Sequence, residues 1–264
     1  MSDRSTRLAG LYATISGGVV VTLSPLLALS YFATKDGASE LDTSTVSAWA
    51  KPAREIAGGL LTFASPERVY GTYLQGFALI FPAVLLCAWV TRSQRPRPKA
   101  GLERWGWRVA LLGYTLLTAG LAVAFCMEVT AISFGTSTNG PLNVLFLSIL
   151  VPGLLLATTG SSVLGIGLMR TDYRPRVTAW LLALGFPLFI VGSVVLGHNS
   201  LGLIPLFLAW AATGARLWRS NPLYADEGSH RAGPEPRSQR GLGRTADATP
   251  VHKAGTAASI ADDR

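Results

Sequence analysis

Four hydroxyl-bearing residues, Thr158, Thr159, Ser161 and Ser162, form the most polar patch inside any apolar stretch of the chain. Hydroxyls within a membrane helix can hydrogen-bond a small solute. They can also bond to carbonyls of their own helix, especially near Pro152, which leaves a carbonyl without its usual donor. We treat these four residues as candidate pocket residues and expect the structural role to compete with solute binding.

Two further polar features lie at the ends of apolar stretches. Ion-coupled transporters usually place an ionisable group within the membrane, and Glu128 is the ionisable residue that comes closest to it. Because it lies at the very end of its stretch, we interpret it as an interfacial residue. His198 and Asn199 form a polar tip between the last two stretches, where Asn suits a tight turn and a binding role is the weaker alternative.

The chain lacks the residue combinations of membrane enzymes and redox proteins. A serine hydroxyl needs a neighbouring base to act as a nucleophile, and the last apolar stretch contains no histidine. None of the three histidines, His198, His230 and His252, lies within an apolar stretch, so haem ligation is not supported. No pair of ligands at helical spacing predicts zinc or iron, and no GxSxG, P-loop or HExxH motif occurs. We expect no catalytic residue, no cofactor and no metal.

Six apolar stretches organise the chain, and none of its 23 Lys and Arg or 15 Asp and Glu residues lies in the core of any of them. Runs of about 18 or more apolar residues can cross a bilayer as helices. The composition agrees, with 49% hydrophobic and only 14% charged residues. The sequence predicts an all-α, polytopic integral membrane protein with a six-helix transmembrane domain over residues 1–219. The spans are expected at about 8–32, 72–90, 107–127, 142–169, 177–197 and 201–218.

Basic residues alternate between connections. The N-terminus, the second and fourth connections and the C-terminal segment hold most of the Lys and Arg, whereas the third and fifth connections hold none. Cytoplasmic loops retain an excess of Lys and Arg, so both termini are predicted to be cytoplasmic and the +8 charge does not indicate nucleic-acid binding. Cleavage of a signal peptide after Ala28-Leu29-Ser30 is the alternative, and it would leave five spans.

The expected outer loop, residues 33–71, contains one helical signal. Pro52 suits a first helical position, and Ile56, Leu60 and Phe63 follow with helical spacing. We expect a short amphipathic helix on the outer leaflet or over the bundle mouth, with an irregular surface loop as the alternative because Gly58-Gly59 weakens a helix. Residues 220–264 are polar and nearly free of aromatic residues, which predicts a disordered cytoplasmic tail.

Two features recur within the spans. Prolines interrupt five of them and, with Pro82 and Pro187 at matching depths, raise the hypothesis of an inverted repeat, as in transporters. Small residues spaced four apart predict close helix contacts. The prolines are Pro25, Pro82, Pro152, Pro187 and Pro205; the small-residue rows are Ala9, Ala13 and Gly17, then Ala157, Ser161 and Gly165, then Ser193 and Gly197.

These observations favour a non-enzymatic protein of the cell membrane, either an accessory subunit or a small passive permease. The alternative is a homodimeric transporter or a permease subunit for a small or lipophilic solute, and a membrane-embedded enzyme comes third. The expected partners are the lipid bilayer and a second copy or another membrane protein bound through the small-residue faces, with no nucleic acid.

Overall fold

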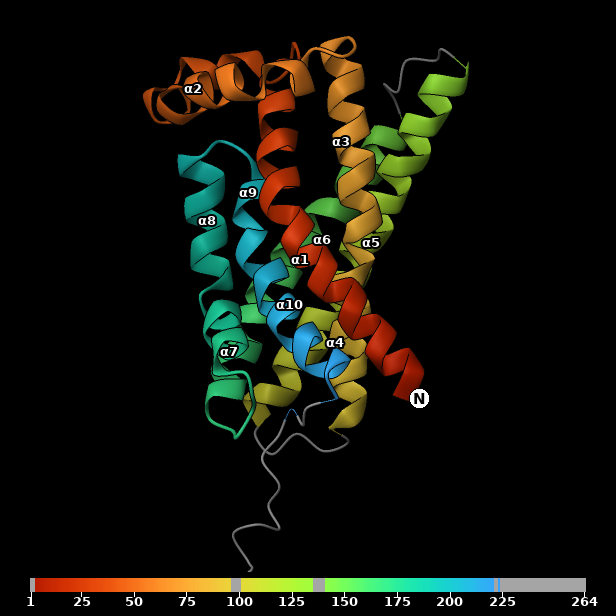
Figure 1. Ribbon diagram of the computed structural model, residues 1–264, viewed down its shortest axis with the longest axis vertical. Coiled ribbons are helices and arrows are strands. Elements are labelled where there is room, and N and C mark those ends of the chain that lie inside the picture. The colour runs from red at the N-terminus through yellow and green to blue at the C-terminus, as the bar shows by residue number, and fades with distance from the viewer. Residues whose placement is uncertain (1–2, 96–100, 135–140, 221–222, 224–264) are drawn as a thin grey trace, which may run out of the picture. The chain divides into compact units, whose positions relative to one another are not determined.

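The computed structural model describes residues 3–95, 101–134, 141–220 and 223, and this part of the chain contains helices and no strand. The remaining residues, including nearly all of the predicted tail, lie outside the description. In chain order the elements are α1 (Asp3–Tyr31), η1 (Ala38–Asp42), α2 (Ser44–Leu61), α3 (Pro66–Ile80), α4 (Pro82–Gln94), α5 (Gly101–Phe134), α6 (Pro141–Met169), α7 (Arg176–Ala183), α8 (Gly185–Val195), α9 (Asn199–Gly202) and α10 (Ile204–Trp218). Figure 1 shows them as a bundle with α2 lying across one end.

The helices form a multi-pass membrane protein. Five helices in the described residues are long and apolar enough to cross a bilayer, and α7 with α8 forms a bent pair that makes a sixth candidate. Large apolar side chains such as Leu79, Val144 and Val194 are exposed on the sides of these helices. Hydrocarbon tolerates such exposure. The all-α fold expected from the sequence is confirmed for the described residues, with five or six helices able to cross a bilayer.

The longest interface joins α5 and α6 through glycines spaced seven residues apart on both helices. The rows are Gly106, Gly113 and Gly120 on α5, and Gly153, Gly160 and Gly167 on α6. A Cβ atom at Gly113 would lie 2.1 Å from the Ala157 amide nitrogen, and one at Gly160 would lie 2.4 Å from that of Ala110. The two backbones are therefore in direct contact, which only glycine permits at these positions.

Two of the predicted small-residue rows also form helix contacts. In α1, Gly17 faces Ala211 of α10 and would place a Cβ 2.3 Å from its methyl carbon. In α6, Gly165 faces the backbone of Ala183 at the end of α7. The row expected in the fifth stretch was wrong: α8 ends at Val195, and Gly197 lies in a turn with a φ of +75°. The positive φ favours glycine there, and a Cβ would also lie 2.7 Å from the Val46 Cγ2 of α2.

Three of the five prolines coincide with helix breaks. Pro82 begins α4 after Phe81, Pro187 follows the break at Leu184, and Pro205 follows the one at Leu203. The break between α7 and α8 bends the chain by 53°. Pro25 and Pro152 lie inside continuous helices. The missing N–H of proline therefore coincides with a helix break at three positions, whereas the helix continues through the other two.

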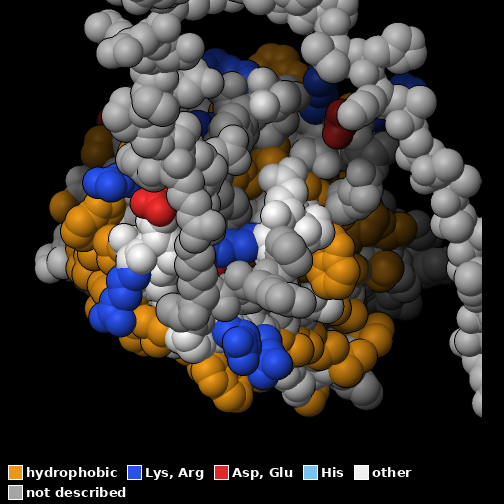
Figure 2. Space-filling model, turned by 90° about the horizontal axis from the view of Figure 1, so that it is seen from below, with side chains coloured by type: hydrophobic (Ala, Val, Ile, Leu, Met, Phe, Trp, Pro, Cys, Tyr) orange, Lys and Arg blue, Asp and Glu red, His pale blue; other side chains and the backbone are white. Residues whose placement is uncertain are grey.

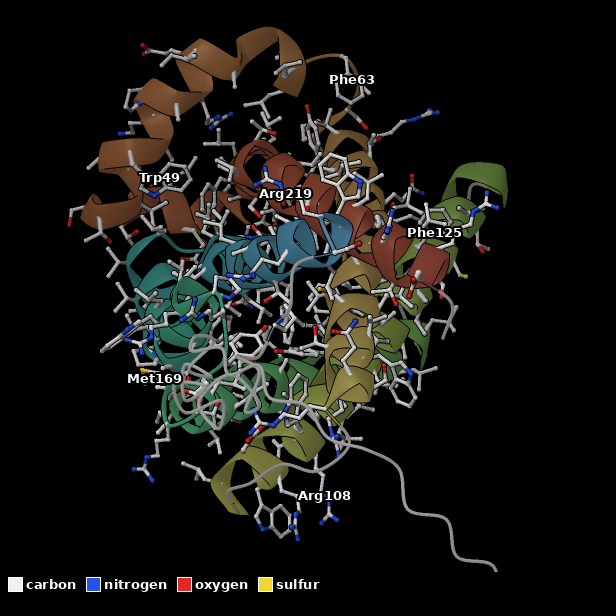
Figure 3. All side chains as sticks on the ribbon, turned by 60° about the horizontal axis from the view of Figure 1, so that its bottom comes forward. Trp49, Phe63, Arg108, Phe125, Met169 and Arg219 are labelled. Atoms are coloured by element: carbon white, nitrogen blue, oxygen red, sulfur yellow. The ribbon has the colours of Figure 1, made fainter. Side chains whose placement is uncertain are left out.

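The amphipathic helix expected over residues 52–63 is present as α2, but it begins earlier than predicted. It begins at Ser44, so Pro52 lies inside it. The residues that pack against the bundle include Val46, Ala50, Trp49 and Leu61, whereas Ile56 is 90% exposed. Ile56 and Leu60, by contrast, point away from the packed side. Figure 3 places Trp49 and Phe63 toward opposite ends of this helix.

Candidate functional site

The broken span α7–α8 faces the hydroxyl patch of α6, and together they form the candidate site. A Cβ at Gly185 would lie 3.7 Å from the Ser161 Cβ and 3.9 Å from the Thr158 carbonyl oxygen. The Phe186 N–H, near the start of α8, donates to the Ser162 hydroxyl oxygen at 2.9 Å. The first amides of a helix have no partner within that helix, so Ser162 supplies an acceptor that the bilayer could not.

The other three hydroxyls of the patch donate to carbonyls of α6. Thr158 donates to the Leu154 carbonyl oxygen at 2.8 Å, and Thr159 donates to that of Leu155 at 2.5 Å. The Ser161 hydroxyl bonds to the Ala157 carbonyl in the same way. The structure thus brings all four predicted residues to one stretch of α6, and each has a partner within the protein.

Ser161 also belongs to a buried polar cluster that sequence reasoning missed. Its hydroxyl lies 2.5 Å from the hydroxyl of Tyr114 on α5, which accepts the Trp210 indole N–H at 3.1 Å. The three side chains are almost fully buried and connect α5, α6 and α10. Trp210 packs between helices, against the rings of Tyr114 and Trp107. Because these buried polar groups hydrogen-bond to one another, we expect this region of the bundle to be rigid.

A second hydroxyl cluster lies between α7 and α10. The Thr178 hydroxyl donates to the Ala209 carbonyl oxygen at 2.9 Å and lies 3.0 Å from the Thr213 hydroxyl. The Tyr173 hydroxyl lies 2.7 Å from the same Thr213 oxygen, and all three residues are buried. No spacing rule identified these residues, because the bonds join positions far apart in the sequence.

At the α2 end, the His198 side chain is half-buried against aromatic rings, whereas Asn199 of the predicted polar tip is exposed. Its ring lies 5.1 Å from that of Tyr31 and 6.4 Å from that of Phe32. The His198 Nδ1 accepts the Ser200 backbone N–H at 3.2 Å, and the Ser200 hydroxyl donates to the Ser24 carbonyl oxygen at 3.1 Å. Burial lowers the pKa of His198 from its usual 6.5 to about 4.

We expect acid to destabilise the protein through His198. The folded state keeps the imidazole neutral until about pH 4, whereas an unfolded chain binds the proton near pH 6.5. Stability is therefore full above pH 6.5 and falls as the pH is lowered toward 4, by about 3 kcal/mol in total. Melting temperatures in detergent should decline more steeply over this window than those of His198→Gln. Equal slopes for the two proteins would contradict the assignment.

Glu128 lies half-buried at the end of its span and turns toward α3. A Cβ at Gly71 would lie 2.3 Å from the Glu128 Oε2, so the absence of a side chain at Gly71 makes room for this carboxylate. The interfacial position inferred from the sequence is compatible with this packing.

A buried ion pair occupies the N-terminal end of the bundle, opposite α2. The Arg95 guanidinium lies 3.3 Å from the Glu103 carboxylate, and Glu103 is fully buried at the start of α5. Its Oε1 accepts the Trp107 indole N–H at 3.3 Å. Sequence reasoning placed Arg95 and Glu103 in a basic connection and did not pair them. The pair holds the end of α4 against the start of α5.

The described residues contain no group of three or more His, Cys, Asp or Glu side chains arranged to hold a metal ion. No family model, no curated protein and no solved structure matches the chain.

Proposed function

We propose that the chain is a non-enzymatic, six-span protein of the cell membrane with both termini in the cytoplasm. The count of six treats α7 and α8 as one bent span. The orientation follows from the excess of Lys and Arg in alternate connections. Figure 2 shows several Lys and Arg side chains on the face of the bundle seen from below. Helix α2 then lies on the extracellular side.

Within that class, we favour an accessory subunit. The observation that carries this proposal is that the polar groups of the candidate site bond to the protein itself, as in Ser161 with Tyr114 and Ser162 with Phe186. A solute site needs polar groups that converge on a ligand, whereas these groups converge on one another. A subunit that only supports a partner needs a rigid bundle and no such opening.

A partner would contact faces other than the predicted small-residue rows. Gly17 of α1 and Gly165 of α6 already pack against α10 and α7 within one chain. The exposed apolar sides of the outer helices remain, for example around Val144 and Val194.

A small permease is the second candidate, and the 53° break between α7 and α8 favours it. Discontinuous membrane helices in transporters place backbone groups beside the substrate. Among the described residues, the Phe186 N–H donates to a single serine hydroxyl, which a polar solute could replace.

Cysteine accessibility distinguishes the two functions. In a protein carrying Cys87→Ala and Cys126→Ala, we expect Thr159→Cys and Ser162→Cys to resist a small water-soluble thiol reagent, because reaction requires water and a thiolate. Thr43→Cys, at an exposed position before α2, serves as the reactive control. Rapid reaction at 159 or 162 in a folded variant would reject the closed bundle and favour the permease.

A further inference from the structure

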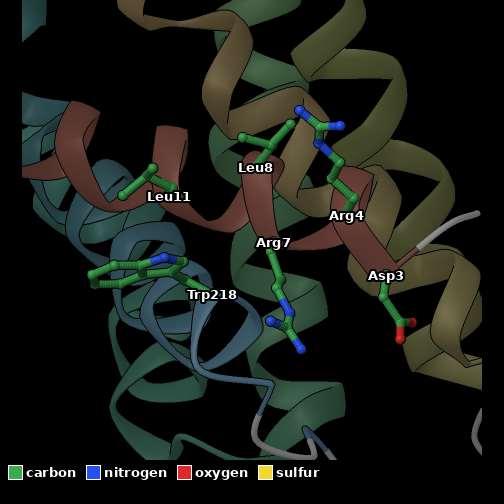
Figure 4. Close-up of a pocket in the computed structure, with 6 residues that line it drawn as sticks. All are labelled: Asp3, Arg4, Arg7, Leu8, Leu11 and Trp218. Carbon is green, nitrogen blue, oxygen red and sulfur yellow. The ribbon is translucent and has the colours of Figure 1, made fainter.

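A groove of about 410 Å³ opens at the N-terminal end of the bundle, between the start of α1 and the end of α10. It lies away from the hydroxyl patch on α6. Figure 4 shows the side chains that line it: Asp3, Arg4, Arg7, Leu8, Leu11 and Trp218. One rim is therefore charged, and the walls toward the membrane are apolar.

Within the described part of the chain, the cations of this groove have no acid partner. Arg4 and Arg7 are separated by about one helical turn and are both exposed, and neither forms an ion pair with an acid among the described residues, Asp3 included. Guanidinium groups bind phosphate oxygens in a bidentate manner. In Figure 4 the two side chains extend in different directions, and exposed side chains change rotamer within nanoseconds, so either can turn toward a bound phosphate.

The apolar part of the groove fits an acyl chain. Leu8 is 57% exposed and Trp218 is 47% exposed, and both belong to helices that cross the bilayer. Tryptophan settles at headgroup depth, which places the charged rim beside the phosphates and the leucines beside the hydrocarbon. Basic pockets between membrane helices recognise anionic headgroups in this way.

We propose that this groove binds an anionic phospholipid, with its phosphate held by Arg4 and Arg7 and an acyl chain along Leu8, Leu11 and Trp218. Asp3 reduces the positive charge of the rim and so weakens the binding of a free anion. A lipid offsets this loss because it also buries apolar surface. The site is independent of the function proposed above and of the orientation of the chain.

The test uses the full-length protein, purified in detergent and titrated with phosphatidylglycerol, phosphatidylcholine or inorganic phosphate while bound lipid is counted by native mass spectrometry. We expect Arg4→Gln/Arg7→Gln to weaken phosphatidylglycerol binding by about tenfold or more, since each surface cation adds about a kcal/mol of attraction. Arg104→Gln/Arg108→Gln removes two exposed cations elsewhere at the same end and is the matched control, for which we expect unchanged binding.

Three results would overturn the proposal. The first is unchanged phosphatidylglycerol binding by Arg4→Gln/Arg7→Gln with the wild-type melting temperature. The second is an equal loss in both double variants, which would indicate attraction by net charge alone. The third is inorganic phosphate or phosphatidylcholine binding as tightly as phosphatidylglycerol. Both substituted arginines are exposed, so the variants are expected to fold, and a wild-type elution profile checks this.

Discussion

Gly113→Leu should abolish the native packing of α5 against α6. A Cβ at this position would lie 2.1 Å from the Ala157 amide nitrogen and 2.5 Å from its Cα, and no rotamer change moves a backbone atom. The two helices must separate, and the neighbouring glycine contacts at Gly106 and Gly120 are then lost together. Overpacking usually lowers the free energy of unfolding by about 1–3 kcal/mol. Because the backbones of both α5 and α6 are in contact here, we expect a loss at or above the upper end of that range.

The measurement is the melting temperature in detergent, which we expect to fall by on the order of 10 °C. Loss of the wild-type peak in size-exclusion chromatography would be the more severe form of the same result. Gly18→Leu is the matched control, because a Cβ at Gly18 of α1 would meet nothing within 4 Å. A Gly113→Leu protein as stable as Gly18→Leu would show that α5 and α6 do not pack through their glycines.

Glu103→Ala should destabilise the protein by about 3–5 kcal/mol, because it removes one partner of a buried ion pair. The carboxylate is fully buried and lies 3.3 Å from the Arg95 guanidinium. Its loss also leaves the Trp107 indole N–H without the acceptor it has at 3.3 Å. The matched control, Glu67→Ala, removes an exposed carboxylate and should change stability little.

A double-mutant cycle separates the ion pair from other effects at this end of the bundle. Arg95→Met/Glu103→Met replaces both charges with apolar side chains, so it should be more stable than the sum of the single effects predicts. Strict additivity of Arg95→Met and Glu103→Met would contradict direct pairing.

The membrane architecture was predictable because it depends on composition over long segments. Each crossing requires many apolar residues in a row, and charges such as Arg170 and Arg174 fall between the crossings. Helix contacts were partly predictable, because Gly17 and Gly165 of the predicted four-residue rows do pack against neighbouring helices. The seven-residue glycine rows of α5 and α6 were visible in the sequence but were missed, since only a spacing of four was considered.

Residues of the candidate site were predictable only where they are neighbours on a single helix, α6. Thr158 and Ser162 stood out because they are neighbours in an apolar stretch. Tyr114 and Trp210 join Ser161 only in three dimensions, so their bonds left no local pattern. Arg95 and Glu103 looked like loop charges because burial depends on how helix ends meet. Helix α2 was predicted from Ile56, Leu60 and Phe63, whereas the residues that pack against the bundle include Val46, Trp49 and Ala50.

The most direct test of the six-span account is labelling of single cysteines in intact cells by a membrane-impermeant maleimide. Thr43→Cys lies at the α2 end and Asp172→Cys at the opposite end, between α6 and α7, and both positions are exposed. In the protein without Cys87 and Cys126, position 43 should react in intact cells, and position 172 should react only after the membrane is permeabilised. Labelling of position 172 in intact cells, or of neither position, would contradict an even number of spans with cytoplasmic termini.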